Sequence, residues 1–389
     1  MVNIGTVFWL GLSQLICWGV FYYLIGVFGD LIIVDTGWSR TIVYGGFSVG
    51  LGVMALVSAL TGRLIDRFGG GRVMAAGSVV GATGCVALAS AYSLSVYYIS
   101  WILIGLAMRM TLYDAAFAAL ARIGGPNSKR PMAQITLLGG LASTCFWPLG
   151  HMLADVYSWR TALIVFAAIS LLTLPIHLML PSHKYKGCVF PGNDVSLPHP
   201  IPLKNRKISA ILYALIFAVM TGLNSGMSAH MIGLLKGLGL GAATAVTIAS
   251  LRGVGQSSAR LADVLFGKNL HPVDLNLMAT LALPVCFTIG LAGMYYAPAV
   301  IFTFMYGAGN GIMSITRGTL PLVLFDLSTY GAFVGKLLIP SFIFSAISPI
   351  LFALVMDGFG ATGVMYLLIV LGSVIFTASL ALRFLSLRT

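Results

Sequence analysis

Three of the ionisable residues inside the long apolar runs of the chain lie deep enough that an exposed charge would be costly. Arg109 and Asp114 fall in one run, and Arg252 falls in another. A planar guanidinium can bind a carboxylate through two parallel hydrogen bonds, so either arginine could anchor an anion. A carboxyl group surrounded by apolar side chains can hold a proton, so Asp114 could carry one. These residue types therefore indicate anion binding and proton transfer.

Arg109 and Asp114 each have a structural interpretation as well. Arg109 could bond backbone carbonyl groups or an acid of a neighbouring helix. Asp114 could form a salt bridge with Arg63 or Arg72 and hold a gate closed. Asp114 follows Arg109 by five residues, about 140° around a continuous helix, so we do not expect the two to pair with each other.

The elements that must position these residues are membrane-spanning helices. Apolar residues make up 59% of the sequence and charged residues only 8%, whereas about a quarter of the residues of a soluble domain are charged. A span needs about 20 apolar residues. On that rule the sequence predicts twelve spans, at 6–34, 41–61, 73–92, 94–121, 132–154, 161–181, 208–233, 240–262, 273–296, 298–325, 332–356 and 361–384.

A polar stretch, 182–207, separates the first six spans from the last six and is predicted to be a cytoplasmic linker. The predicted domains are therefore 1–181 and 208–389, each a six-helix bundle. Fifteen basic residues fall in the loops of one side and three in those of the other. This bias places both termini in the cytoplasm.

The composition also argues against other classes of protein. The net charge of +12 is explained by orientation in the membrane, so we expect no nucleic-acid partner. The five cysteines fit neither a disulfide framework nor a zinc site. No nucleotide-binding loop, metal motif or nucleophile elbow is present. We therefore expect no cofactor, no metal and no enzyme activity; a membrane-embedded enzyme or receptor is the least favoured reading.

Two motifs recur about 200 residues apart. Arg63-Leu64-Ile65-Asp66, followed by Phe68-Gly69, matches Arg260-Leu261-Ala262-Asp263, followed by Phe266-Gly267. Pro148 likewise matches Pro349. Two six-helix halves repeated in the same orientation predict a pseudo-two-fold axis along the membrane normal and a binding site between the halves. In this alignment Arg252 matches Ala55, so its charge belongs to one half only, which favours a role in substrate binding.

The segment Gly62-x-x-x-Asp66-Arg67-x-Gly69 resembles the loop motif between the second and third helices of the major facilitator superfamily. It departs from that motif at Gly70-Gly71, where basic residues are commoner. Gly37-Trp38-Ser39-Arg40 resembles bacterial monocarboxylate-type members, and Asp155 through Trp159-Arg160 resembles an outer turn of the superfamily.

This resemblance implies alternating access by rocking of the two halves, driven by an ion gradient or by exchange, in a bacterial cytoplasmic membrane. In the monocarboxylate-type transporters an arginine of the eighth helix belongs to the anion site, and the resemblance assigns that role to Arg252. We expect the chain to act as a monomer.

The candidate residues form three groups. Gln14, Trp18 and Tyr22 recur every four residues on one face of the first helix and could line a cavity or bond neighbouring helices. The expected substrate-binding residues are Arg252, Arg109, Tyr22, Asn224, Gln14, Trp18, Asn310 and Trp147. Asp114 is the expected proton-coupling residue. The expected gating residues are Gly62, Arg63, Asp66, Arg67, Gly69, Arg72, Arg260 and Asp263. His230, near the end of the seventh span, is expected to contact solvent.

These features predict a secondary active transporter of a small organic anion, with a carboxylate bound by Arg252 and Arg109 and with protons or a counter-substrate as the coupled species. The alternative is an exporter or importer of a larger amphipathic compound, such as a drug or a metallophore, because the first helix carries an aromatic stripe. The sequence does not distinguish import from export.

Overall fold

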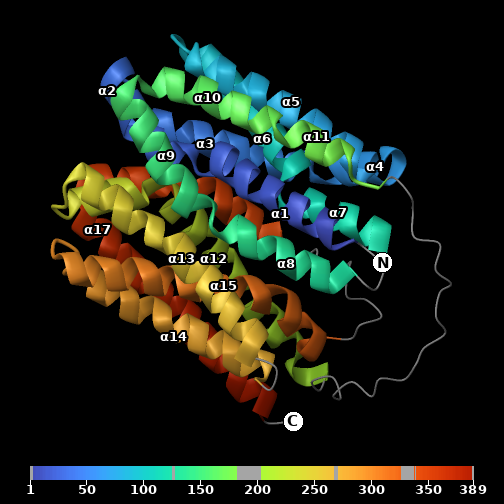
Figure 1. Cartoon of the computed structure of the whole chain (residues 1–389). Helices are drawn as coiled ribbons and strands as arrows, with labels where there is room; N and C mark the ends of the chain where they lie inside the picture. The colour runs from blue at the N-terminus through green and yellow to red at the C-terminus, as the bar shows by residue number, and fades with distance from the viewer. Residues whose placement is uncertain are drawn as a thin grey trace. The chain divides into compact units, whose positions relative to one another are not determined.

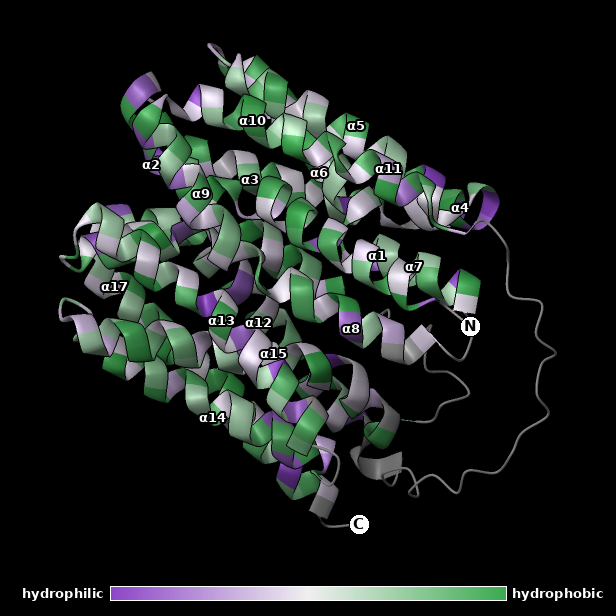
Figure 2. Ribbon diagram, in the orientation of Figure 1, coloured by the Kyte–Doolittle hydropathy of each residue, from purple (hydrophilic) through white to green (hydrophobic). Residues whose placement is uncertain are grey.

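The computed structural model describes residues 3–124, 128–181, 203–266, 270–325, 337 and 339–387, which are helical almost throughout (Figure 1). Apolar residues predominate along these helices (Figure 2). In this part of the chain, eight helices are long and apolar enough to cross a membrane, or nine if one bent pair counts as a span. The protein is therefore an all-α polytopic membrane protein, and the expected fold class is confirmed.

Internal contacts divide the chain into two units, residues 1–190 and 191–389. Most of the expected linker, 182–202, lies outside the described residues, and the first helix of the second unit begins at Leu203 rather than at 208.

Most expected spans of the first unit are interrupted helices, and the 73–92 span, on α5, is continuous. The unit comprises α1 (Ile4–Cys17), η1 (Trp18–Tyr22), α2 (Leu24–Thr36), α3 (Arg40–Leu56), α4 (Ser58–Phe68), α5 (Gly70–Ala89), α6 (Leu94–Thr111), α7 (Tyr113–Gly124), α8 (Lys129–Gly140), α9 (Ala142–Val156), α10 (Trp159–Leu171) and α11 (Thr173–Leu178). Side chains bond the carbonyl groups near two of these breaks, as described below.

The second unit has longer helices. It comprises α12 (Leu203–Gly237), α13 (Ala242–Phe266), α14 (Pro272–Gly290), α15 (Tyr296–Leu324) and α17 (Ile339–Leu387). The last two expected spans both lie on α17, which is broken at Gly360 (φ +67°), a conformation that suits glycine. The start of the eleventh span, 332–336, lies outside the described residues.

The motif between α4 and α5 is mostly helix, and a single glycine makes the turn. Arg63, Asp66 and Arg67 lie on α4, which ends at Phe68, and Gly69 adopts φ +91° before α5 begins. A Cβ at Gly71 would lie 2.5 Å from the His177 carbonyl oxygen, and one at Gly70 would overlap Ala119. Close packing of α5 against α7 and α11 therefore explains why these two positions carry no basic side chain.

Candidate functional site

Arg252 is fully buried within the second unit and is held by neutral groups. Its Nη1 donates to Ser228 Oγ (2.9 Å) and its Nη2 donates to Asn224 Oδ1 (2.6 Å), both on α12. The guanidinium carbon lies 5.3 Å from the centre of the Tyr306 ring on α15, a cation–π distance. Asn310 Nδ2 donates to the same Asn224 oxygen (2.9 Å). Three helices thus converge on one cation.

Two glycines of α15 bring that helix against α13 at this point. A Cβ at Gly307 would lie 2.9 Å from the carbonyl carbon of Arg252, and a Cβ at Gly311 would lie 2.5 Å from the Gln256 carbonyl oxygen. Small residues at such positions allow two backbones to approach closely. The close approach sets Tyr306 and Asn310 beside the guanidinium and its partners.

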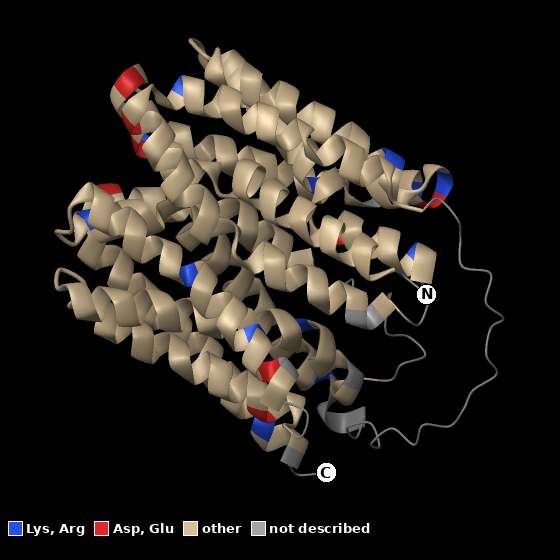
Figure 3. Cartoon of the chain, viewed as in Figure 1, with Lys and Arg blue, Asp and Glu red and all other residues tan. Residues whose placement is uncertain are grey.

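The three acidic residues that the structure describes in the second unit lie near a helix end or a helix break. Among the described residues, charged positions are few along the middles of the helices (Figure 3). Asp263 lies near the end of α13, Asp274 lies in the first turn of α14, and Asp357 lies three residues before the break at Gly360. Asp274 accepts a hydrogen bond from Arg383 Nε (2.6 Å). Arg252 is thus a cation within the bundle whose guanidinium bonds neutral side-chain oxygens.

Arg109 and Asp114 form an ion pair, so the expectation that they would not pair is wrong. The helical-wheel argument assumed one continuous helix, but α6 ends at Thr111 and Leu112 is extended (ψ −173°) before α7 begins. The break brings the two side chains together. Asp114 is 50% exposed and Arg109 is 15% exposed. The expected burial of Asp114 is therefore wrong, and its ion-pair partner, on α6, is neither Arg63 nor Arg72.

Gln14 supports the same break. Its Nε2 donates to the Thr111 carbonyl oxygen (2.8 Å), at the end of α6. Gln14 is buried, and its Oε1 accepts no hydrogen bond from the described part of the chain. The structure thus gives Gln14 a bond between helices, which was the alternative to lining a cavity.

Trp18 and Tyr22 lie in the short π-helix η1, where the wider turn adds a residue to the α-helical register. Their rings remain neighbours at 4.8 Å, and Trp18 also contacts Tyr113 at 4.9 Å. Trp147 is fully buried, and its Nε1 donates to the Tyr23 carbonyl oxygen (3.1 Å), just after the π-turn. Trp147 is therefore a packing residue that stabilises the interrupted first span.

The expected gating residues separate into two environments. Arg63, Asp66, Arg67 and Arg72 are exposed at the α4–α5 turn, as expected for a surface motif. Arg260, their counterpart in the repeat, is instead buried on α13 and donates to Ser314 Oγ on α15 from Nε (3.2 Å) and Nη2 (3.0 Å). Its expected place in a surface loop is wrong, because α13 continues to Phe266. Asp263 is half-buried one turn later.

The sequence model of the Major Facilitator Superfamily matches residues 10–335. The chain belongs to the Major Facilitator Superfamily. It is therefore a multi-pass membrane transporter rather than an enzyme. A solved structure of similar fold is a bacterial homolog of the human lysosomal transporter Spinster, in an inward-facing and occupied conformation, with a TM-score of 0.69 and 14% identity over 98% of this chain and 96% of that chain. A search of curated protein sequences finds no match.

Arg122 has a structural role in this transporter that the sequence did not predict. From α7, its Nη1 donates to the carbonyl oxygens of Ile65 (2.8 Å) and Asp66. The last carbonyl groups of a helix have no partner within the helix, and a cation there also favours the helix dipole. Arg122 therefore fixes the end of α4 against α7. A basic residue in an expected cytoplasmic loop was the available signal, but its partner is set by tertiary packing.

Ser225 was also missed, and the expected solvent contact of His230 is wrong. His230 is fully buried, and its Nε2 donates to the Pro349 carbonyl oxygen (2.9 Å). Ser225 Oγ donates to the Ser345 carbonyl oxygen (2.5 Å). Proline has no N–H, so Pro349 leaves the Ser345 carbonyl without its helical partner. In this transporter, two side chains of α12 donate hydrogen bonds to carbonyl groups around the proline of α17.

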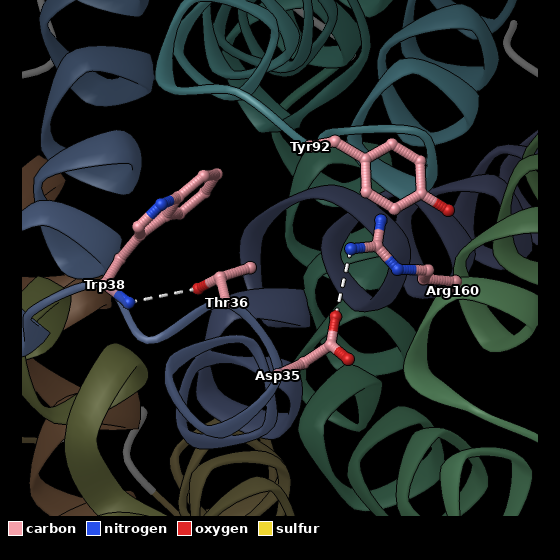
Figure 4. A pocket seen from close by; sticks show the side chains of 5 residues that line it. All are labelled: Asp35, Thr36, Trp38, Tyr92 and Arg160. Carbon is pink, nitrogen blue, oxygen red and sulfur yellow. Dashed lines mark hydrogen bonds and ion pairs between the residues drawn. The ribbon is translucent and has the colours of Figure 1, made fainter.

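A pocket of about 440 Å³ lies at the end of α2 in the first unit (Figure 4). The Arg160 guanidinium lies between the Tyr92 ring, 4.3 Å away, and the Asp35 carboxylate, 3.0 Å away. Its Nη1 also donates to the carbonyl oxygens of Ala89 and Ala91. Arg160 thus ties the ends of three helices together, which gives a structural role to the Asp155–Arg160 turn that resembles the superfamily.

Proposed function

We propose that the chain is a secondary active transporter that moves a small organic anion, bearing a carboxylate, across a bacterial cytoplasmic membrane by alternating access. The single observation that supports it is the buried Arg252, whose guanidinium is bonded by the neutral oxygens of Asn224 and Ser228. The proposal includes the two halves 1–181 and 208–389, the linker 182–207, cytoplasmic termini and a monomeric protein.

The arrangement around Arg252 suits exchange of one acceptor for another. A carboxylate adds charge–charge attraction and can accept two parallel hydrogen bonds from one guanidinium, neither of which the neutral oxygens of Asn224 and Ser228 provide. An arriving carboxylate therefore displaces Asn224 Oδ1 and Ser228 Oγ from the two terminal nitrogens. Asn224 also accepts from Asn310 on α15, so its release changes a bond between α12 and α15. Substrate binding is in this way transmitted to the helices around the site.

Proton coupling is the second part of the proposal, and it rests on the Arg109–Asp114 ion pair. Protonation of Asp114 removes the negative charge that holds Arg109 and so releases α6 from α7 at their break. Because Asp114 is half exposed, protons reach it from water. The Asp114→Asn variant cannot carry the proton. In vesicles preloaded with substrate it is expected to exchange internal for external substrate, but it should lose the substrate accumulation that a pH gradient drives. Wild-type-like accumulation by this variant contradicts Asp114 as the coupling residue.

Neutralising Arg252 tests the anion site. Purified protein in proteoliposomes is assayed for uptake of labelled short carboxylates, with Arg252→Gln as the test and Arg383→Gln as the control. Arg383 lies in the same unit and has its own partner, Asp274. We expect Arg252→Gln to abolish uptake while its melting temperature in detergent stays near that of the wild type. Full transport by a folded Arg252→Gln variant refutes the anion site.

A second candidate function rests on the aromatic cluster of Trp18, Tyr22, Tyr23, Phe47 and Tyr113, with ring centres 4.8–5.3 Å apart for neighbouring pairs such as Trp18–Tyr22 and Tyr22–Phe47. Such a cluster also suits a larger amphipathic compound. A thermal-shift screen of short carboxylates against bulky amphiphiles separates the two candidates, because each predicts stabilisation by one class alone.

A further inference from the structure

Three polar side chains follow one another along α13 at intervals of four residues. Arg252, Gln256 and Arg260 are 0%, 7% and 4% exposed, so all three are buried. Residues four apart lie on neighbouring positions of one helix face. Four residues rise about 6 Å along a helix, so the two arginines begin about 12 Å apart with the glutamine midway. Buried groups of this kind are costly unless they are bonded or serve a ligand.

A matching line lies on α15, at the same interval. Tyr306 packs against the Arg252 guanidinium, Asn310 bonds its partner Asn224, and Ser314 accepts two hydrogen bonds from Arg260. The two lines therefore run side by side within one unit, and the glycine contacts between α13 and α15 hold them there.

Gln256 contributes an unsatisfied hydrogen-bond acceptor to this line of polar side chains. Its Oε1 is buried and accepts no hydrogen bond from any residue that the structure describes. An unsatisfied buried acceptor costs about 1–3 kcal/mol, so a group that donates to it is favoured. Helix packing accounts for the bonds between Arg260 and Ser314, but it leaves this acceptor unexplained.

The first unit does not repeat the arrangement. Arg63, the counterpart of Arg260 in the repeated motif, is exposed. In the same alignment Arg252 matches Ala55 and Gln256 matches Ala59. The duplicated framework thus folds without a buried polar line at this place, which favours a role in recognition.

We propose that the three α13 side chains form a two-anchor site for an elongated dicarboxylate with a hydroxyl group between its carboxylates. This inference rests on the proposed function. One carboxylate binds Arg252, the other binds Arg260 in place of Ser314, and the hydroxyl donates to Gln256 Oε1. Arg260 and Gln256 thereby determine specificity, while Arg252 binds any carboxylate.

Three five-carbon acids test the site, because they differ only in the groups that the site is proposed to bind. Pentanoate has one carboxylate, glutarate has two, and 3-hydroxyglutarate adds the central hydroxyl. Dissociation constants are measured by calorimetry on the full chain in detergent. The variants are Arg260→Gln, Gln256→Met, which keeps the side-chain length, and Arg383→Gln as the control.

A charge-assisted bond lost from a site weakens binding by about tenfold or more. We expect wild type and Arg383→Gln to bind glutarate at least about tenfold more tightly than pentanoate, and 3-hydroxyglutarate more tightly again. Arg260→Gln removes the preference for the second carboxylate, and Gln256→Met removes the preference for the hydroxyl. If Arg260→Gln does not fold, Arg260→Lys, which keeps one charge, is expected to reduce the same preference in part.

Two results overturn the proposal. Equal affinity of the wild type for pentanoate and glutarate refutes the second anchor but leaves the anion transporter in place. No binding of any of the three acids by folded wild type refutes the proposed function together with this inference.

Discussion

Replacing Asp114 by asparagine tests the ion pair that joins α6 to α7. The substitution keeps the size of the side chain and removes its charge, so Arg109 loses its carboxylate partner across the break at Leu112. The matched variants are Arg109→Gln and the double substitution. If the pair is real, the second substitution should cost less once the first has been made.

The magnitude follows from the exposure of the two side chains. Exposed ion pairs contribute about 0.2–1 kcal/mol, whereas removing one partner of a buried pair costs about 3–5 kcal/mol. Arg109 is 15% exposed and Asp114 is 50% exposed, which places this pair between those limits. We therefore expect Asp114→Asn to lower the free energy of unfolding by about 1–2 kcal/mol. The coupling energy between the two sites should be about 1 kcal/mol.

Equilibrium unfolding in mixed micelles measures these free energies. Asp155→Asn is the control, because its carboxylate pairs with His151 and is 63% exposed, so its loss should cost less than about 0.5 kcal/mol. Additivity of the two single substitutions within about 0.3 kcal/mol would show that Arg109 and Asp114 do not interact, and the account of the break would then be wrong.

Two further predictions concern helix contacts of the second unit. Gly307→Ala should lower stability by about 1–3 kcal/mol, because its Cβ would lie 2.9 Å from the Arg252 carbonyl carbon. Gly318→Ala on the same helix is the control, because a Cβ there meets nothing within 4 Å and the substitution should be neutral or stabilising. Equal melting temperatures for the two variants would contradict the close approach. Ser225→Ala should cost about 1–3 kcal/mol by leaving the Ser345 carbonyl unbonded, and it should cost less in a Pro349→Ala background, where the restored N–H bonds that carbonyl; an unchanged cost in denaturant titrations would exclude this role.

The sequence alone identified the membrane class, the helices, the repeat and the superfamily. Long apolar runs exclude a soluble domain, because lipid is the only solvent in which such a surface is stable. The same logic singled out Arg252, a buried cation that occurs in one half only. Asn224 and Asn310, expected like Arg252 to bind substrate, lie beside it.

Tertiary structure decided which partner each polar group has. Arg109 and Asp114 pair because α6 stops at Thr111, and the sequence there, Met110-Thr111-Leu112-Tyr113, contains no proline or glycine to announce the break. Arg260 is buried, although its repeat counterpart is exposed, because α13 packs closely against α15, where Ser314 accepts hydrogen bonds from its guanidinium. Hydropathy measures the cost of placing a charge in lipid, and for that reason it predicted the membrane-spanning segments reliably. It carries no information on which distant side chain offsets the cost, since that depends on how helices far apart in the sequence meet.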